Sequence, residues 1–137
     1  MQKILVTLVA ILGLAAGAFA DSFVNLTTVK DDIVVTDGAR LHAVLDDSGT
    51  ISIAPNATVT LWMAIIQESG SKTGAGITCL GNATIILESE NYICGRSSGF
   101  PAIYVPKGST LTIKGPGKLT AIGNGWAAGI GGGEGLN

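Results

Sequence analysis

The sequence predicts an all-β fold, a parallel β-helix (solenoid) of about four turns, on the strength of three observations. A phrase recurs with its threonine every 26 positions, as "PNATVTL" (55–61), "GNATIIL" (81–87) and "KGSTLTI" (107–113). Apolar and polar residues alternate within each phrase, as in strands whose successive side chains point to opposite faces. No helical stripe follows the N-terminal apolar segment. Short strands repeated at a fixed step are typical of a parallel β-helix, in which each turn covers its neighbour's core.

The N-terminal segment, residues 1–20, has the layout of a secretory signal peptide. Lys3 precedes an apolar run from Ile4 to about Ala16, and the small-x-small triplet 18–20 follows. That layout predicts cleavage after Ala20, and the run is shorter than the ~20 residues that span a bilayer. We therefore expect a secreted or cell-surface protein, with the periplasm as an alternative.

The remaining chain divides into an N-terminal cap or incomplete turn (21–31) and the repeats (32–137). The first, weaker copy of the threonine phrase is "DIVV" (32–35). A third column of the repeat holds Leu41, Ile93 and Leu119, with Gln67 as the exception. A second phrase keeps the same step in "GTISI" (49–53), "AGITC" (75–79) and "PAIYV" (101–105), and its fourth copy, "AAGIGGG" (127–133), comes one residue late.

The alternation within these phrases predicts two stacks of inward side chains. The first stack contains Ile33/Val35, Val59/Leu61, Ile85/Leu87 and Leu111/Ile113, and the second contains Ile51/Ile53, Ile77/Cys79 and Ile103/Val105. An antiparallel β-sandwich is the competing fold, because its strands also come every 8–12 residues or roughly so. The constant step of the repeat favours the parallel β-helix.

Charge and cysteine content exclude several classes of function. The formal net charge is −2, and lysines and arginines are too few and scattered to neutralise many phosphates, so nucleic acid is not expected as a partner. Cys79 and Cys94 would enter an oxidising compartment, where a disulfide between them is allowed. Two cysteines and the single His42 are too few for a structural zinc site.

Several motifs have a structural interpretation that is stronger than the functional one. "GNGWAA" (123–128) matches a dinucleotide-binding fingerprint, but that motif needs a following helix, which the glycine-rich sequence after it does not favour. Asn56 and Asn82 fit N-x-T sequons and share a repeat column with Gly108. This interchange of Asn with Gly predicts a left-handed turn position.

The acidic residues and the histidine do not form a catalytic pattern. Asp31-Asp32 and Asp46-Asp47 could bind calcium, but acids that flank strands in turns are the stronger explanation. Glu88 falls in the same column as Lys114, so we expect an ion pair between them. His42 has no positioned serine partner and is expected to be a wall residue.

The aromatic residues are the candidate ligand-binding groups. Trp62 and Tyr104 alternate with inward residues and should face outward, where flat rings suit stacking on sugars. Phe100 and Trp126 share a corner column, where they form a ladder or seal the core. The candidate carbohydrate-binding residues are Trp62, Tyr104 and Trp126, and no catalytic or metal-binding residue is assigned.

The stretch "GSTLTIKGPGKLTA" followed by "AAGIGGG" resembles a family of bacterial exported β-helix proteins. These are described as carbohydrate-binding-domain or adhesin-like proteins within the pectin-lyase-like superfamily, and the match covers about 50–133. The resemblance implies a right-handed parallel β-helix, a secreted or surface location, and a polysaccharide ligand, sometimes with calcium. No lyase motif of the superfamily can be carried over to this chain.

We therefore expect a non-catalytic polysaccharide-binding or adhesin-like module. One alternative is the N-terminal fragment of a polysaccharide lyase or hydrolase whose catalytic residues follow Asn137. Another is a structural surface stalk that associates with itself through an open solenoid end, because the last repeat has no polar cap and such an end exposes unpaired strand edges. The absent cap also predicts that the sequence is truncated.

Overall fold

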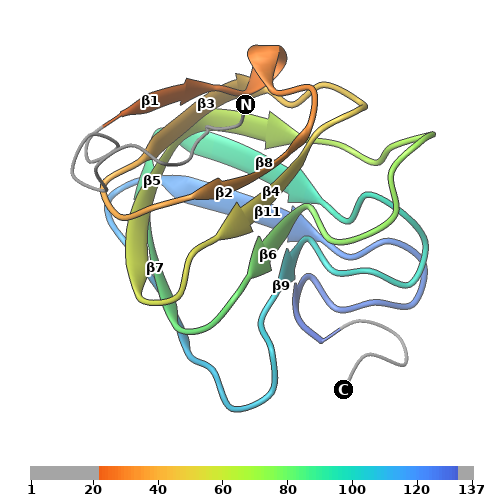
Figure 1. Ribbon diagram of the computed structural model, residues 1–137. Helices are drawn as coiled ribbons and strands as arrows, with labels where there is room; N and C mark the ends of the chain where they lie inside the picture. Colours follow the sequence, from red (N-terminus) through yellow and green to blue (C-terminus); the bar gives the residue numbers. More distant parts are fainter. Residues whose placement is uncertain (1–21, 133–137) are drawn as a thin grey trace.

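The computed structural model describes residues 22–132, which form strands with a single short 3-10 helix (Figure 1). The predicted signal peptide and the end of the last glycine-rich stretch lie outside these residues. The elements are β1 (Phe23–Asn25), η2 (Leu26–Thr28), β2 (Asp32–Val35), β3 (Arg40–Val44), β4 (Thr50–Ile53), β5 (Ala57–Ile66), β6 (Ile77–Cys79), β7 (Ala83–Glu88), β8 (Glu90–Cys94), β9 (Ile103–Tyr104), β10 (Leu111–Lys114), β11 (Lys118–Ile122) and β12 (Ile130–Gly131).

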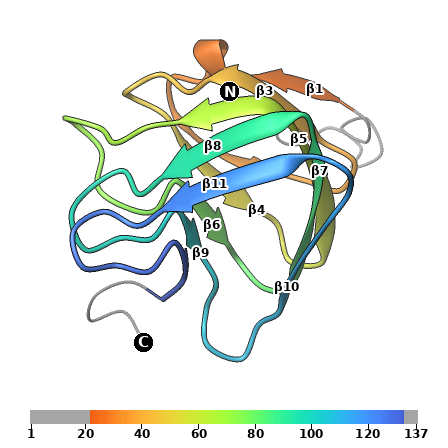
Figure 2. The same ribbon diagram turned by 180° about the vertical axis from the view of Figure 1, so that it is seen from behind.

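The strands form two sheets, between which the chain passes repeatedly. A seven-stranded sheet has the order β1-β3-β5-β7-β10, with β8 paired to β5 and β11 paired to β8; a five-stranded sheet has the order β12-β9-β6-β4-β2. Figure 2, the view from behind, shows β8 and β11 side by side at the front. Every strand pair within residues 22–132 is parallel. The all-β prediction is confirmed, and the antiparallel β-sandwich is wrong.

The 26-residue step sets the register in the middle of both sheets. Ala57 pairs with Ala83, and Ile77 pairs with Ile103, 26 positions apart in each case. The last copy of the second phrase comes one residue late, as its sequence indicated. Ile130, 27 positions after Ile103, is the residue that pairs with it.

Two registers differ from the sequence prediction. The segment 32–35 was expected beneath the threonine phrase, but Ile33 pairs with Ile51 in the five-stranded sheet, so it belongs to the other stack. The partner of Thr84 is Thr112 and not Thr110. The turn before β10 therefore contains two more residues than a strict repeat, because Thr110 precedes the strand and its carbonyl accepts from the Ala83 amide.

The register also differs from the strict repeat in the third repeat column, and the one polar residue expected there is replaced by an apolar one. Ile66 pairs with Ile93, and Ile93 pairs with Ala121, so an apolar residue occupies the position that the strict repeat gave to Gln67. The shift comes from corners where the backbone turns. Met63 and Ser89 have φ of 56° and 58°, and the Ser89 hydroxyl accepts from the Met63 amide.

The core lies between the two sheets and contains most of the predicted inward residues. The buried members of both stacks are Val35, Val59, Leu61, Ile85, Leu87, Ile51, Ile53, Ile77, Cys79 and Ile103. At the β1 end, Leu26 of η2 is fully buried against this core. At the β10 end, Leu111, Leu119 and Ala121 pack on the core but are only partly covered. Within the described part of the chain, no helix is long and apolar enough to cross a membrane.

A buried arginine forms hydrogen bonds to several loops at one corner of the fold. Arg96 is 1% exposed, and its guanidinium donates to the backbone carbonyls of Gln67, Asp46, Asp47 and Gly49 at 2.9–3.1 Å. Its positive charge is therefore compensated by carbonyl dipoles of loops that are distant in sequence. This single side chain holds the β3–β4 loop against the segment that follows β5.

Candidate functional site

The outer face of the sheet β1-β3-β5-β7-β10 gathers the side chains most suited to binding a ligand. On β5, Thr58, Thr60 and Trp62 alternate with the core residues Val59 and Leu61, so all three face away from the core, and of these Thr60 is covered to 9% exposure. The parallel register continues these rows onto neighbouring strands. One row contains Thr58, Thr84 and Thr112, and another contains Trp62 and Glu88.

Three rings from successive strands form an exposed aromatic cluster on this face. Phe23 of β1, His42 of β3 and Trp62 of β5 have ring centroids 5.7–6.4 Å apart, and Phe23 meets both of the other rings edge to face. Phe23 is 62% exposed and Trp62 is 38% exposed. Edge-to-face contacts between rings stabilise such a cluster, and here they leave ring surface open to solvent.

An ion pair crosses β5 beside the aromatic cluster. The Arg40 guanidinium on β3 donates to both carboxylate oxygens of Glu88 on β7, at 2.6 and 3.4 Å. The same guanidinium lies 5.3 Å from the centre of the Phe23 ring. The predicted pair of Glu88 with Lys114 is wrong, because the register sets Lys114 beside Ile86. Arg40 thus links the charged pair to the aromatic cluster, and a cation over a ring face is attracted to it.

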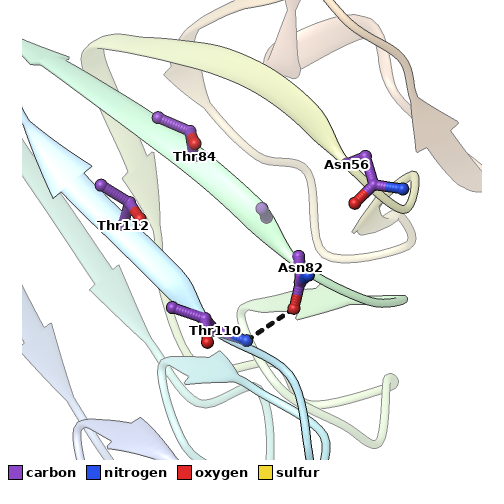
Figure 3. A pocket seen from close by; sticks show the side chains of 6 residues that line it. Asn56, Asn82, Thr84, Thr110 and Thr112 are labelled. Carbon is purple, nitrogen blue, oxygen red and sulfur yellow. Dashed lines mark hydrogen bonds between the residues drawn. The ribbon is translucent and has the colours of Figure 1, made fainter.

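A polar cleft lies further along the same face (Figure 3). It encloses about 300 Å³ and is lined by Asn56, Asn82, Ala83, Thr84, Thr110 and Thr112. The Asn82 side-chain oxygen accepts from the Thr110 amide at 2.8 Å, which fixes the orientation of that side chain. None of the lining side chains is charged, so the cleft offers hydrogen-bonding groups without net charge.

The turn residues at this cleft follow the sequence prediction in part. Asn56 and Gly108 have φ of 65° and 86°, which confirms a left-handed position for both. Asn82 is not among the left-handed residues, and its side chain instead satisfies the amide that precedes β10.

The structure distributes the three predicted carbohydrate-binding residues over different parts of the fold. Trp62 belongs to the aromatic cluster, whereas Tyr104 lies on β9 of the five-stranded sheet, where it pairs with Thr78. Trp126 lies in the turn between β11 and β12 and is 90% exposed. Its ring makes no contact with Phe100 or with any other aromatic ring of residues 22–132. Of these three residues, Trp62 is the one that contacts other aromatic rings within the described residues.

Three of the four acidic residues that could have bound calcium, namely Asp32, Asp46 and Asp47, have other partners. Asp32 accepts from Thr50 and Lys72, and Asp46 forms a 2.6 Å ion pair with Lys30. Hydrogen bonds from Lys30 and Ser48 hold the pKa of Asp46 well below its usual range. In the described ranges, no three His, Cys, Asp or Glu side chains come together as a metal-binding group.

The remaining polar groups have structural partners. His42 packs in the aromatic cluster, and Glu90 forms an exposed 3.4 Å ion pair with Lys118. Cys79 and Cys94 are both buried free thiols, and burial raises the pKa of Cys79 to about 11. A neutral, buried thiol is a poor nucleophile. The arrangement supports binding through rings and hydrogen bonds.

Sequence reasoning did not identify Phe23 and Arg40 as site residues. Phe23 lies before the first repeat, on a strand of only three residues. Arg40 lies on β3, whose register with β5 joins Leu41 to Leu61 and therefore departs from the 26-residue step. The short alternating segment "RLHAV" was a signal for an outward Arg40 and His42, but it did not reveal which strand lies beside it.

The glycine-rich stretch forms strand and turn as far as residue 132, where the described part of the chain ends. "GNGWAA" leads into β12 and not into a helix, so the dinucleotide-binding interpretation is excluded by its own structural requirement. A Cβ atom on Gly123 would lie 2.1 Å from the Ala127 carbonyl oxygen, so glycine is required by close backbone approach.

Comparison with known proteins gives no assignment at this point. No known protein family, no curated protein and no solved structure matches this chain.

Proposed function

We propose that the chain is an exported, non-catalytic polysaccharide-binding module, adhesin-like in character, with its ligand on the outer face of the sheet β1-β3-β5-β7-β10. The observation that carries the proposal is the exposed aromatic cluster of Phe23, His42 and Trp62. Exposed rings held by their neighbours offer a rigid apolar platform. The apolar faces of sugar rings stack on such platforms.

The polar groups around the aromatic cluster suit the hydroxyl groups of the same ligand. Glu88 and Arg40 lie directly beside the rings and can accept and donate hydrogen bonds, respectively. Hydrogen bonds to charged groups are stronger than those between neutral groups. A site with a few apolar contacts and a few fixed polar groups is typical of small-ligand binding.

The proposed scaffold is a right-handed parallel β-helix. Three findings support it: all strand pairs among the described residues are parallel, the chain alternates between two sheets, and paired residues in the middle of the fold lie 26 positions apart. The resemblance of residues 50–133 to bacterial exported carbohydrate-binding β-helix proteins of the pectin-lyase-like superfamily agrees with this scaffold. The predicted signal peptide is the basis for export.

Affinity electrophoresis of residues 21–137 tests the proposal. Gels would contain pectic, cellulosic or mannan polysaccharides, each with and without calcium. We expect retardation by one polymer, which stays intact. Trp62→Ala should abolish most of the retardation, and Trp126→Ala, which removes an exposed ring outside the aromatic cluster, should leave it nearly unchanged. Equal retardation of wild type and Trp62→Ala would contradict the proposed site, and cleavage of the polymer would favour an enzyme.

A second candidate function, self-association, is favoured by the uncovered side of the last strands. Among the strands of residues 22–132, β10 and β12 are terminal in their sheet orders, and β8 is the one partner of β11. Leu111, Leu119 and Ala121 point toward the core but are only partly covered. Unpaired strand edges and exposed core residues are the features through which β proteins associate.

A further inference from the structure

The polar cleft and the aromatic cluster share one face of the molecule. Thr58 and Trp62 both point outward from β5 and are four positions apart, which corresponds to roughly 13 Å along a strand. The row that starts at Thr58 continues through Thr84 to Thr112 at the cleft. The two sites therefore face the same direction, on a continuous hydrogen-bonded sheet.

The cleft presents polar groups that have no partner elsewhere in the described chain. The hydroxyls of Thr84, Thr110 and Thr112 and the side-chain amide of Asn56 make no hydrogen bond within residues 22–132. Asn82 uses its oxygen to bind the Thr110 amide, which leaves its NH2 group as a donor. Figure 3 shows Thr84 and Thr112 on neighbouring strands, with Asn82 at the edge of the cleft.

We infer that the polar cleft is a second subsite for the glycan bound by the aromatic cluster, so that the ligand is an extended chain of neutral sugar units. The inference rests on the proposed function. The separation of the two sites exceeds the size of one sugar ring, so a monosaccharide occupies only one of them. The uncharged lining of Asn, Thr and Ala matches hydroxyl groups, and it offers no lysine or arginine to a uronate carboxylate.

The experiment is isothermal titration with oligosaccharides of two to six units, prepared from cellulose, mannan and polygalacturonate. The cleft variant is Thr84→Val/Thr112→Val, because valine keeps the β-branched shape and removes only the hydroxyls. Thr120→Val is the matched control, since Thr120 is an exposed threonine on β11, away from the cleft. Asn56→Gly is a second cleft variant, because glycine adopts the left-handed φ of Asn56 without strain.

We expect affinity to rise from the two-unit to the six-unit neutral oligosaccharide and to stay low for oligogalacturonides. The double valine variant should weaken six-unit binding by about five- to twentyfold, the loss expected for two hydrogen bonds. The double valine variant should leave binding of the two-unit oligosaccharide unchanged. Asn56→Gly should behave in the same way: weaker binding of the six-unit oligosaccharide and unchanged binding of the two-unit one. Trp62→Ala should weaken binding at every length, and Thr120→Val at none.

Two results would overturn the second subsite while leaving the proposed function intact. In the first, both cleft variants bind oligosaccharides of every length with the same affinity as wild type, while Trp62→Ala loses binding. The other is tighter binding of oligogalacturonides than of neutral chains. Unchanged affinity of Trp62→Ala for all oligosaccharides would instead contradict the proposed function. Thermal unfolding of each variant establishes that the change in affinity does not come from loss of fold.

Discussion

At the scale of single residues, side chains that lie far apart in sequence fix both the loops and the candidate site. Arg40 reaches Glu88 across an intervening strand, and Arg96 reaches carbonyls near residue 47. Neither contact follows from periodicity, because both join positions that the 26-residue step does not relate. The sequence indicated that Trp62 faces outward, but its ring neighbours became known only from the structure.

Replacement of Arg96 by methionine should strongly destabilise the fold. The change leaves carbonyls of Gln67, Asp46, Asp47 and Gly49 without their charged donor in a buried corner. We expect a loss of about 2–4 kcal/mol in the free energy of unfolding, because hydrogen bonds to charged groups contribute more than neutral ones. Urea unfolding followed by circular dichroism measures it. Lys107→Met, in an exposed turn, is the control, and equal stability of the two variants would contradict this role for Arg96.

Stability should fall in acid through Asp46. Its folded pKa lies below the unfolded value of about 4, chiefly because Lys30 donates to the carboxylate. The ionised form is thus favoured by folding, so its contribution is present above pH 4 and is lost as the pH falls below it. Unfolding temperatures measured from pH 5 to pH 2 should show a smaller decrease for Asp46→Asn than for wild type.

Asp31→Asn is the control for the acid experiment. Asp31 is exposed and forms no ion pair or side-chain hydrogen bond within residues 22–132. The unfolding temperature of the Asp31→Asn variant should change with pH as that of wild type does. A profile of Asp46→Asn that coincided with wild type would show that the ion pair with Lys30 adds no pH dependence.

At the scale of strands and turns, close backbone approach decides which positions must be glycine. A Cβ atom on Gly76 would lie 2.5 Å from the Cys94 carbonyl oxygen and 2.7 Å from that of Ala102. Gly76→Ala should therefore destabilise the fold by about 1–3 kcal/mol, the usual cost of overpacking. Gly70→Ala is the matched control, because nothing lies within 4 Å of its Cβ position. Urea midpoints of the two variants would be compared, and similar midpoints would refute the packing argument.

Much of the strand pattern was predictable, because alternation of apolar residues depends only on local geometry. The pairs of Ile51 with Ile77 and of Ile77 with Ile103 follow the repeat. The register of β2 and β10 was not predictable, because a short turn can add residues without changing the strand pattern. The "DIVV" segment fits either stack by composition, and its pairing with β4 became known only from the structure.

At the scale of the whole molecule, the two ends of the fold differ. Leu26 of η2 is buried at the β1 end, whereas inward residues of β10 and β11 are partly uncovered at the other. We therefore expect concentration-dependent association in sedimentation velocity experiments on residues 21–137. Ile113→Lys on β10 should abolish it, because a charge would enter the exposed edge. Leu80→Lys, at an exposed leucine between β6 and β7 and away from these edges, is the control, and a monomer at every concentration would exclude association.

The aromatic cluster illustrates what whole-molecule topology adds to a sequence. Phe23, His42 and Trp62 come from three successive strands of one sheet, and no spacing between their positions in the sequence predicts this contact. The candidate site could be predicted as far as its central tryptophan. Its extent depends on strand order, which periodicity alone does not determine.

The contacts of Arg96 have a consequence for the order in which the chain acquires its structure. During synthesis from the N-terminus, the loop near Asp46 is made about 50 residues before the guanidinium that binds it. The corner between β3 and β4 therefore closes only after β8 has been made. Closing a loop of this length costs conformational entropy, and the Arg96 hydrogen bonds that offset this cost form only once the loop is closed. A nascent chain that stops before Arg96 lacks these hydrogen bonds, and this corner stays open.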